Sequence, residues 1–183
     1  VTALEYIREN PDTYQNYSYN CNGSFRLGDG KISCYHGSNH GQVDFKKSFA
    51  KSCNSSFANI GMSLDREAFQ ETLNDLLFNK DLPLTLNYAK SSALVSESTP
   101  SAEMMQTSIG QGKTQITPMH LNMITCAIAN DGVLMKPYMI DRVENDEGTV
   151  VKNFKASEYG RLMSEDEAAI LRQLMTDVVQ EGT

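Results

Sequence analysis

The sequence has no apolar run approaching the roughly 20 residues that a membrane-spanning helix needs, no initiator methionine and no signal-peptide pattern at its start. It is also poor in basic residues, with 16 lysines and arginines against 23 aspartates and glutamates and a formal charge of -7. A nucleic-acid binder needs a basic face to displace counterions from phosphates, so this balance argues against such a partner. The remaining composition, 40% hydrophobic and 21% charged over 183 residues, is that of a globular chain with one sizeable core.

Both ends of the chain look cut. The sequence opens inside a helical pattern, residues 1–9, with no capping residue ahead of it, and it stops at residues 182–183 directly after another helical pattern. We therefore expect the chain to be the middle of a longer protein.

The spacing of apolar residues predicts a mainly α-helical chain with one β-hairpin. The hairpin is expected at 138–143 and 149–154, on either side of the turn at 145–148. Residues 12–42 and 85–110 show no clear period and are expected as loops, although so long a loop is uncommon unless something holds it together. Helices are expected where apolar positions recur at helical spacing: before Pro11, from Asp44 to about Asn54, around Phe57 and ending before Gly61, from Asp65 to about Asn79, after Thr117, and after Ser164.

Three short motifs match known signatures but lack the required context. Residues 110–114 resemble the end of a phosphate-binding loop, yet position 107 is threonine where that loop needs glycine, and the next helix begins too late. Ser48 and Lys51 match Ser-x-x-Lys, in which a lysine amine acts as base beside a serine hydroxyl. Nothing around them suggests an exposed helix start, so we interpret them as a helix-face serine and a solvated lysine. Lys113-Thr-Gln lacks the glycine of a Lys-Thr-Gly strand.

Ser52 and Asn54 match Ser-x-Asn, a motif in which a hydroxyl relays protons and an amide holds a substrate carbonyl. Spacing alone is a weak signal, because serine and asparagine are abundant and Ser18-Tyr-Asn20 matches as well. A turn that ends a helix explains the same residues, since serine and asparagine cap and turn readily. Only the surrounding sequence separates the two interpretations.

Residues 108–138 carry four short motifs in a fixed order: Ile-Gly-Gln-Gly at 109–112, Thr-Pro at 117–118, Ala-Asn-Asp-Gly at 129–132 and Pro-Tyr at 137–138. In this order and spacing the stretch closely resembles penicillin-binding protein transpeptidase domains of the monofunctional, class B type. The resemblance extends over essentially the whole chain. Residues 51–61 look like the family's Ser-x-Asn turn and following helix, residues 175–183 like the helix before the Lys-Thr-Gly strand, and residues 1–5 like the continuation of the nucleophile helix.

The resemblance implies the helical part of the penicillin-binding and serine β-lactamase-like transpeptidase fold. In this family a Ser-x-x-Lys serine attacks the D-Ala-D-Ala end of a peptidoglycan stem peptide, the acyl group passes to an amine of a neighbouring stem, and β-lactams trap the same serine. By analogy, Ser52 relays a proton toward the leaving amine and Asn54 holds the substrate's amide. The nucleophile and Lys-Thr-Gly motifs are expected just before Val1 and just after Thr183, so the isolated chain should not perform acyl transfer.

The resemblance also implies partners and a location. The partners are the stem peptide and β-lactams in the complete domain, together with the remaining segments of the same protein. The location is the extracytoplasmic face of the bacterial cell membrane, with an anchor outside this chain. Within one partial transpeptidase domain we expect a zinc and loop region at 12–54, a helical core at 55–132, the hairpin at 133–156 and a C-terminal helix at 164–181. Two other functions stay open: a non-catalytic β-lactam sensor of the same fold, and a zinc-stapled interaction domain.

Three of the four cysteines, Cys21, Cys34 and Cys53, occur in the same part of the sequence as His40. Three thiolates and one imidazole form a closed tetrahedral zinc set with no open position for catalysis. The spacing lacks the tight Cys-x-x-Cys pairs of zinc fingers. However, the irregular stretch at residues 12–42 has few apolar residues, so a cross-link or a bound metal is needed to hold it together. Some elongation-type and sporulation-type members of the resembled family carry a metal site at this place. We predict a structural zinc that ties the Ser-x-Asn turn to the loop through Cys53.

Two alternatives to the metal remain at this point. A Cys21–Cys34 disulfide suits an extracytoplasmic domain but leaves Cys53 and His40 without a role, and independent buried thiols are the third possibility. The last cysteine, Cys126, is expected to be a small core residue in its helix. The other two histidines, His36 and His120, are expected at the surface or in helix caps.

Overall fold

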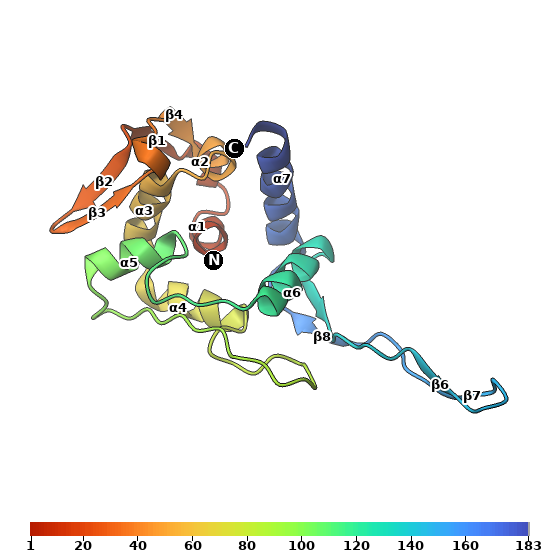
Figure 1. Ribbon diagram of the computed structural model, residues 1–183. Coiled ribbons are helices and arrows are strands. Elements are labelled where there is room, and N and C mark those ends of the chain that lie inside the picture. The colour runs from red at the N-terminus through yellow and green to blue at the C-terminus, as the bar shows by residue number, and fades with distance from the viewer. Residues whose placement is uncertain (183) are drawn as a thin grey trace.

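The computed structural model describes residues 1–182 and contains seven α-helices. Helix α1 lies at the centre, and the other helices are arranged around it (Figure 1). Thr183, the last residue of the stretch compared with the family's final helix, lies outside the described residues. The helices are α1 Thr2–Glu9, α2 Phe45–Ala50, α3 Asn54–Ser63, α4 Arg66–Asp75, α5 Ser101–Ser108, α6 Pro118–Ala129 and α7 Glu165–Glu181.

The strands of the described range are short and pair into four two-stranded antiparallel sheets at the periphery: β1 with β4, β2 with β3, β5 with β8, and β6 with β7. The chain is therefore mainly helical, as its apolar spacing predicts. The strands are β1 Ser18–Cys21, β2 Ser24–Leu27, β3 Gly30–Ser33, β4 Gly41–Asp44, β5 Val133–Met135, β6 Arg142–Glu144, β7 Val150–Asn153 and β8 Glu158–Arg161, and short 3-10 helices occupy Tyr14–Asn16 (η1) and Tyr35–Gly37 (η2).

Helix α1 is buried on most of its surface, including polar positions. Leu4 and Ile7 enter the main core, and Glu5, also buried, accepts a hydrogen bond from the Thr72 hydroxyl of α4. Arg8, at the other end of the helix, is ion-paired with Asp75 at 2.9 Å and with Glu167 of α7 at 3.0 Å. Buried charges require such partners, so these contacts fix α1 against α4 and α7.

The helix starts expected at Asp44, Asp65, Thr117 and Ser164 are confirmed, and each of these residues caps its helix. The side chains of Asp44, Asp65 and Thr117 each accept a hydrogen bond from a backbone N–H three residues on. Ser164 and Glu167 form the complete capping box at the start of α7. The expected hairpin is also present, as β6–β7, and projects away from the helices (Figure 1), although its first strand begins at Arg142 rather than at Tyr138.

The two predicted loops contain regular structure that the sequence patterns did not show. Residues 12–42 hold the strands β1 to β3 and both 3-10 helices, because strands of four residues are too short to display a period. The region 85–110 ends in α5, whose Met104 and Met105 are buried. Helix α3 also continues through Gly61, where an added Cβ would lie 1.7 Å from the Ser108 hydroxyl, so this glycine lets α3 and α5 approach closely.

One single-residue expectation is wrong, and a second is only half confirmed. Cys126 is exposed on α6, whereas Met123 and Ala127 of that helix enter the core. His120 is not at the surface, since the side chain is only 1% exposed, but its ring does cap a helix, because it contacts Leu76, the C-cap residue of α4. Its Nε2 is 2.6 Å from the Leu76 carbonyl oxygen, and its ring packs against Phe78. His36 is exposed, as expected.

Buried His120 makes the stability of the fold depend on pH. Burial lowers the pKa of His120, against the smaller effect of the hydrogen bond to Leu76, so the unfolded chain takes up a proton that the folded chain resists. Stability therefore falls as pH drops below the unfolded histidine pKa of about 6.5. We expect H120Q, which keeps a hydrogen-bond donor, to lose less unfolding free energy between pH 7 and pH 5 in denaturant titrations. Equal pH slopes for H120Q and the exposed control H36Q would contradict this assignment.

Candidate functional site

The Ser-x-Asn motif forms the turn between α2 and α3. Ser52 is exposed and adopts a left-handed backbone conformation with φ of 47°, uncommon for a residue with a side chain. Hydrogen bonds on both sides hold it there: Ser52 N–H donates to the Phe49 carbonyl at 3.1 Å, and Cys53 N–H donates to the Ser48 carbonyl at 2.9 Å. Such strained positions persist where the surrounding structure enforces them, and they concentrate at functional sites.

Asn54 is the first residue of α3 and follows Ser52 by two positions. Its side-chain amide donates a hydrogen bond to the Ser33 carbonyl at the end of β3, at 3.2 Å. The amide carbonyl has no protein partner among the hydrogen bonds of the described residues, and Asn54 is half-buried. The structure thus brings the Ser52 hydroxyl and the Asn54 amide to one surface, as the motif requires.

Both residues line a groove of about 610 Å³. One wall comes from the turn and from Phe49 and Phe57 of α2 and α3, and a second from Ile109 after α5. The third wall is the last part of α7, where Met175, Val178 and Val179 contribute apolar side chains. A groove with apolar walls and two polar groups at one point can hold and orient a peptide-like ligand.

Next to this turn, the four predicted metal ligands come together. The Sγ atoms of Cys21, Cys34 and Cys53 and a ring nitrogen of His40 all lie within 4.8 Å of one another. The three cysteines are buried and His40 is half-buried. Cys21 ends β1, Cys34 follows β3, His40 precedes β4, and Cys53 is the N-cap residue of α3, so the cluster joins both small sheets to the Ser-x-Asn turn.

The predicted disulfide alternative does not match the structure, in which all four cysteines are free thiols. The Cys21 and Cys34 sulfurs are 3.7 Å apart, far beyond a disulfide bond of about 2.05 Å. The Cys34 and Cys53 sulfurs are 3.8 Å apart, and Cys21 Sγ is 3.4 Å from His40 Nδ1.

Ser55 contacts all three sulfurs and was not singled out in the sequence. Its Oγ is 3.1 Å from Cys21 Sγ, 3.3 Å from Cys34 Sγ and 3.5 Å from Cys53 Sγ. Burial raises the pKa of Cys21, but hydrogen bonds from Ser55, His40 and Gly23 outweigh burial and bring it down to about 6. Burial raises the pKa of Cys53 to about 12. The one signal in the sequence that indicates a role for Ser55 is its position two residues after Cys53, a predicted metal ligand.

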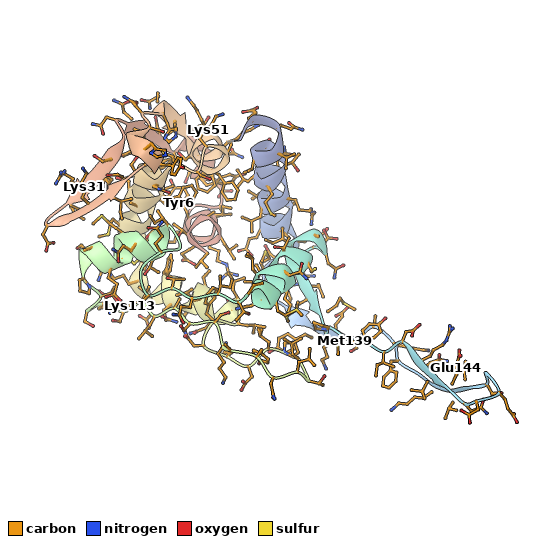
Figure 2. The ribbon with its side chains drawn as sticks, viewed as in Figure 1. Tyr6, Lys31, Lys51, Lys113, Met139 and Glu144 are labelled. Carbon is orange, nitrogen blue, oxygen red and sulfur yellow. The ribbon has the colours of Figure 1, made fainter. Side chains whose placement is uncertain are left out.

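The other motif matches have structural roles. The Ser48 hydroxyl is fully buried and accepts a hydrogen bond from Ser56 at 2.7 Å. Lys51 is half-buried rather than fully solvated, and its amine donates to the Glu181 carbonyl of α7. Figure 2 shows Lys51 at the end of α2 that lies beside α7, and Lys113 far from it, at the left of the molecule below α5. Lys113 pairs with Glu103 at 2.9 Å, and no helix begins there.

One protein-family model matches most of the chain. The model of the penicillin-binding protein transpeptidase domain matches residues 11–183. The chain is 28% identical over 141 residues to the peptidoglycan D,D-transpeptidase PbpA of Mycolicibacterium smegmatis, covering 75% of the chain and 28% of that protein. It is 26% identical over 188 residues to the stage V sporulation protein D of Bacillus subtilis, covering all of the chain and 28% of that protein. The chain thus spans about a quarter of the length of these relatives.

Solved structures show the same fold. A penicillin-binding protein A from Mycobacterium tuberculosis, solved as an imipenem acyl-enzyme complex, superposes with a TM-score of 0.86 at 22% identity, over 98% of this chain and 42% of that one. The D,D-transpeptidase domain of a peptidoglycan glycosyltransferase from Eggerthella lenta gives a TM-score of 0.87 at 22% identity, over 99% of this chain and 47% of that one. No described helix is long and apolar enough to cross a membrane.

Proposed function

The chain belongs to the penicillin-binding protein transpeptidase family, and from this premise we propose that it supplies the Ser-x-Asn part of a D,D-transpeptidase active site. The observation that carries the proposal is the strained turn that presents Ser52 beside Asn54 at the mouth of a groove. The relatives named as D,D-transpeptidases and the β-lactam acyl-enzyme complexes of similar structures support the same reaction class.

In this proposal the ligand is the D-Ala-D-Ala end of a peptidoglycan stem peptide, or a β-lactam in its place. The Asn54 amide binds a backbone amide of the stem, and the Ser52 hydroxyl relays a proton toward the leaving amine as the acyl-enzyme forms. The attacking serine and its lysine base belong to other segments of the protein, because Ser48 and Lys51 are engaged with Ser56 and Glu181. The isolated chain is therefore expected to bind these segments and to catalyse no acyl transfer.

The test uses the full-length protein, a synthetic stem peptide ending in D-Ala-D-Ala and an amine acceptor. A transpeptidase releases D-Ala and forms the cross-linked product. A β-lactam sensor would form a long-lived penicillin adduct without turning over the peptide, and an interaction domain would do neither. Either of these last two outcomes would contradict the proposed function.

We further propose that Cys21, Cys34, His40 and Cys53 hold a structural zinc ion. Zinc bonds of about 2.3 Å to sulfur and about 2.0–2.1 Å to nitrogen place tetrahedral ligands about 3.8 Å apart for two sulfurs and about 3.5 Å apart for sulfur and nitrogen. Three of the six spacings between these side chains, 3.7, 3.8 and 3.4 Å, fit those values, and all six are within 4.8 Å. The ion would supply no step of the reaction, since the four protein ligands leave no open position.

The role of this cluster is to support the Ser-x-Asn turn. Cys53 lies between Ser52 and Asn54, so a ligand bond at Cys53 fixes where both functional side chains point. Ser55 supports the thiolates with two donors: its hydroxyl donates to Cys21 Sγ at 3.1 Å, and its backbone N–H donates to Cys34 Sγ at 3.5 Å.

The zinc proposal is tested by metal analysis of protein prepared without added metal. We expect one zinc per chain, retained in the control C126S because Cys126 is exposed and away from the cluster. Metal-free protein containing a Cys21–Cys34 disulfide would contradict the proposal.

We also propose that the protein acts at the extracytoplasmic face of the bacterial cell membrane, anchored by a segment outside this chain. Peptidoglycan, the proposed substrate, lies outside that membrane. Free cysteine ligands call for a reducing or anaerobic setting there, because an oxidising one would pair the thiols.

A further inference from the structure

Two lysines at opposite ends of α2 reach across to α7. Lys46, in the first turn of α2, is ion-paired with Asp177 at 3.1 Å between Nζ and Oδ1. Lys51, just after the last turn, donates from Nζ to the backbone carbonyl of Glu181. The two helices pack side by side, with the C-terminal end of α7 next to α2 (Figure 1).

The spacing of these contacts matches a two-point attachment. The lysines are five positions apart and their acceptors four positions apart, or about 7.5 Å and 6 Å at 1.5 Å per residue. Two contacts one helical turn apart fix both the position of α7 along α2 and its rotation about its own axis. A single contact would leave the rotation free.

The Asp177 end of this attachment is deeply buried. Asp177 is only 2% exposed, its Oδ1 also accepts a hydrogen bond from Gln173 at 3.1 Å, and its Oδ2 has no partner among the described residues. A buried carboxylate that loses its cation is strongly unfavourable. Lys46 is itself 51% exposed, so the pair is closed to solvent only on the carboxylate side, and removing the lysine alone would leave the buried Asp177 carboxylate without a cation.

The attached part of α7 is also the part that lines the groove. Val178 and Val179 directly follow Asp177 and face the groove that holds Ser52 and Asn54. Val179 is 87% exposed, so little else holds this wall in place from the groove side. Helix α2, in turn, runs directly into the Ser52 turn, so the two lysines connect the two walls.

We propose that Lys46 and Lys51 are positioning residues that set the distance between α7 and the Ser52–Asn54 turn, and so the geometry in which the groove holds an acylating ligand. This inference rests on the proposed function, which it deepens. It also gives the lysine of the Ser48-x-x-Lys51 match a structural role that requires no base chemistry. Neither lysine contacts substrate, and their effect passes through α7.

The test is the kinetics of acylation of the full-length protein by benzylpenicillin, measured as rate against penicillin concentration. The variants are K51M and K46Q/D177N, the second of which removes the ion pair without leaving a charge buried. K46R keeps a cation at position 46, and K47M is the matched control, because Lys47 sits in the same helix but donates to Gln42 rather than to α7.

We expect K51M and K46Q/D177N to lower the acylation rate constant at saturating penicillin by roughly 10- to 100-fold, as displacements of about 1 Å do. K46R and K47M should stay within about twofold of the parent. Amide hydrogen exchange at residues 175–181 should accelerate in K51M and K46Q/D177N but not in K46R or K47M. This local measurement reports on the end of α7 even where a variant also changes the overall stability.

Two results would overturn the proposal, and they are distinguishable. In the first, penicillin acylates the parent, but K51M and K46Q/D177N have the same acylation rate constant and the same hydrogen-exchange rates at residues 175–181 as K47M. This result contradicts the positioning role alone. A parent that penicillin does not acylate contradicts the proposed function, and the positioning role with it.

Discussion

Replacing Cys53 with serine is expected to release the proposed zinc ion and to lower the free energy of unfolding by at least about 3 kcal/mol, since the binding energy of a structural zinc is folding energy. For a chain of this size that loss corresponds to a fall in melting temperature of roughly 6–12 °C. The cause is that Cys53 is fully buried and joins α3 to both small sheets. Calorimetry and metal analysis of the same samples measure both effects.

The matched control is C126S, which should keep the metal and change the unfolding free energy by less than about 0.5 kcal/mol, as surface substitutions do. A second variant, S55A, keeps all four ligands and removes the hydroxyl that meets the sulfurs. It should weaken metal binding by roughly 10- to 100-fold without abolishing it. C53S protein that retains zinc and melts with the parent would contradict the metal assignment.

Removing the polar groups of the turn is expected to slow acylation of the full-length protein by penicillin. S52A should cost roughly 10²- to 10⁴-fold in rate if its hydroxyl relays a proton. N54A should cost roughly 10²- to 10³-fold if its amide orients the reacting amide, which is the usual effect of losing one positioned donor. Stopped-flow acylation rates over a range of penicillin concentrations give these values.

The controls for this pair are S63A and N122A, which make the same substitutions on α3 and α6 away from the groove. Both should acylate within about twofold of the parent. The melting temperatures of S52A and N54A should stay close to the parent, because Ser52 is exposed and Asn54 makes a single hydrogen bond to Ser33. Unchanged acylation rates in S52A and N54A would remove the turn from the mechanism.

Features encoded by a few neighbouring residues could be predicted from the sequence. The caps at Asp44, Asp65, Thr117 and Ser164 depend on side chains three residues or fewer from the N–H groups they bind, and all four are present. The hairpin around residues 145–148 is likewise local, because its turn residues specify it.

Features decided by tertiary contacts could not be predicted in this way. The sequence pattern does not indicate α5, because its buried methionines form no clear helical period of their own and α5 packs on α3 and β3. Cys126 and Met123 lie three residues apart in an apolar helix, and only the packing of α6 places Met123 inside and Cys126 outside. His120 is buried because Leu76, 44 residues away, offers a carbonyl to its ring.

In the candidate site, too, some features can be predicted from local sequence and others depend on tertiary contacts. The residue types of the proposed ligands and the Ser-x-Asn spacing can be identified in the sequence, and the structure brings Cys21, Cys34, His40 and Cys53 within 4.8 Å of one another. Ser55 and the pair Lys46–Asp177 were not visible, because their roles depend on three chain segments meeting at one point.

In the proposed function, this chain serves a penicillin-reactive serine that lies outside residues 1–183. The most direct measurement is intact-mass and peptide mapping of the full-length protein after exposure to benzylpenicillin, with the isolated 183-residue chain treated in parallel. We predict one adduct on the full-length protein, located outside residues 1–183, and none on the isolated chain. A stoichiometric acylated serine within residues 1–183, or no adduct on the full-length protein, would contradict the account.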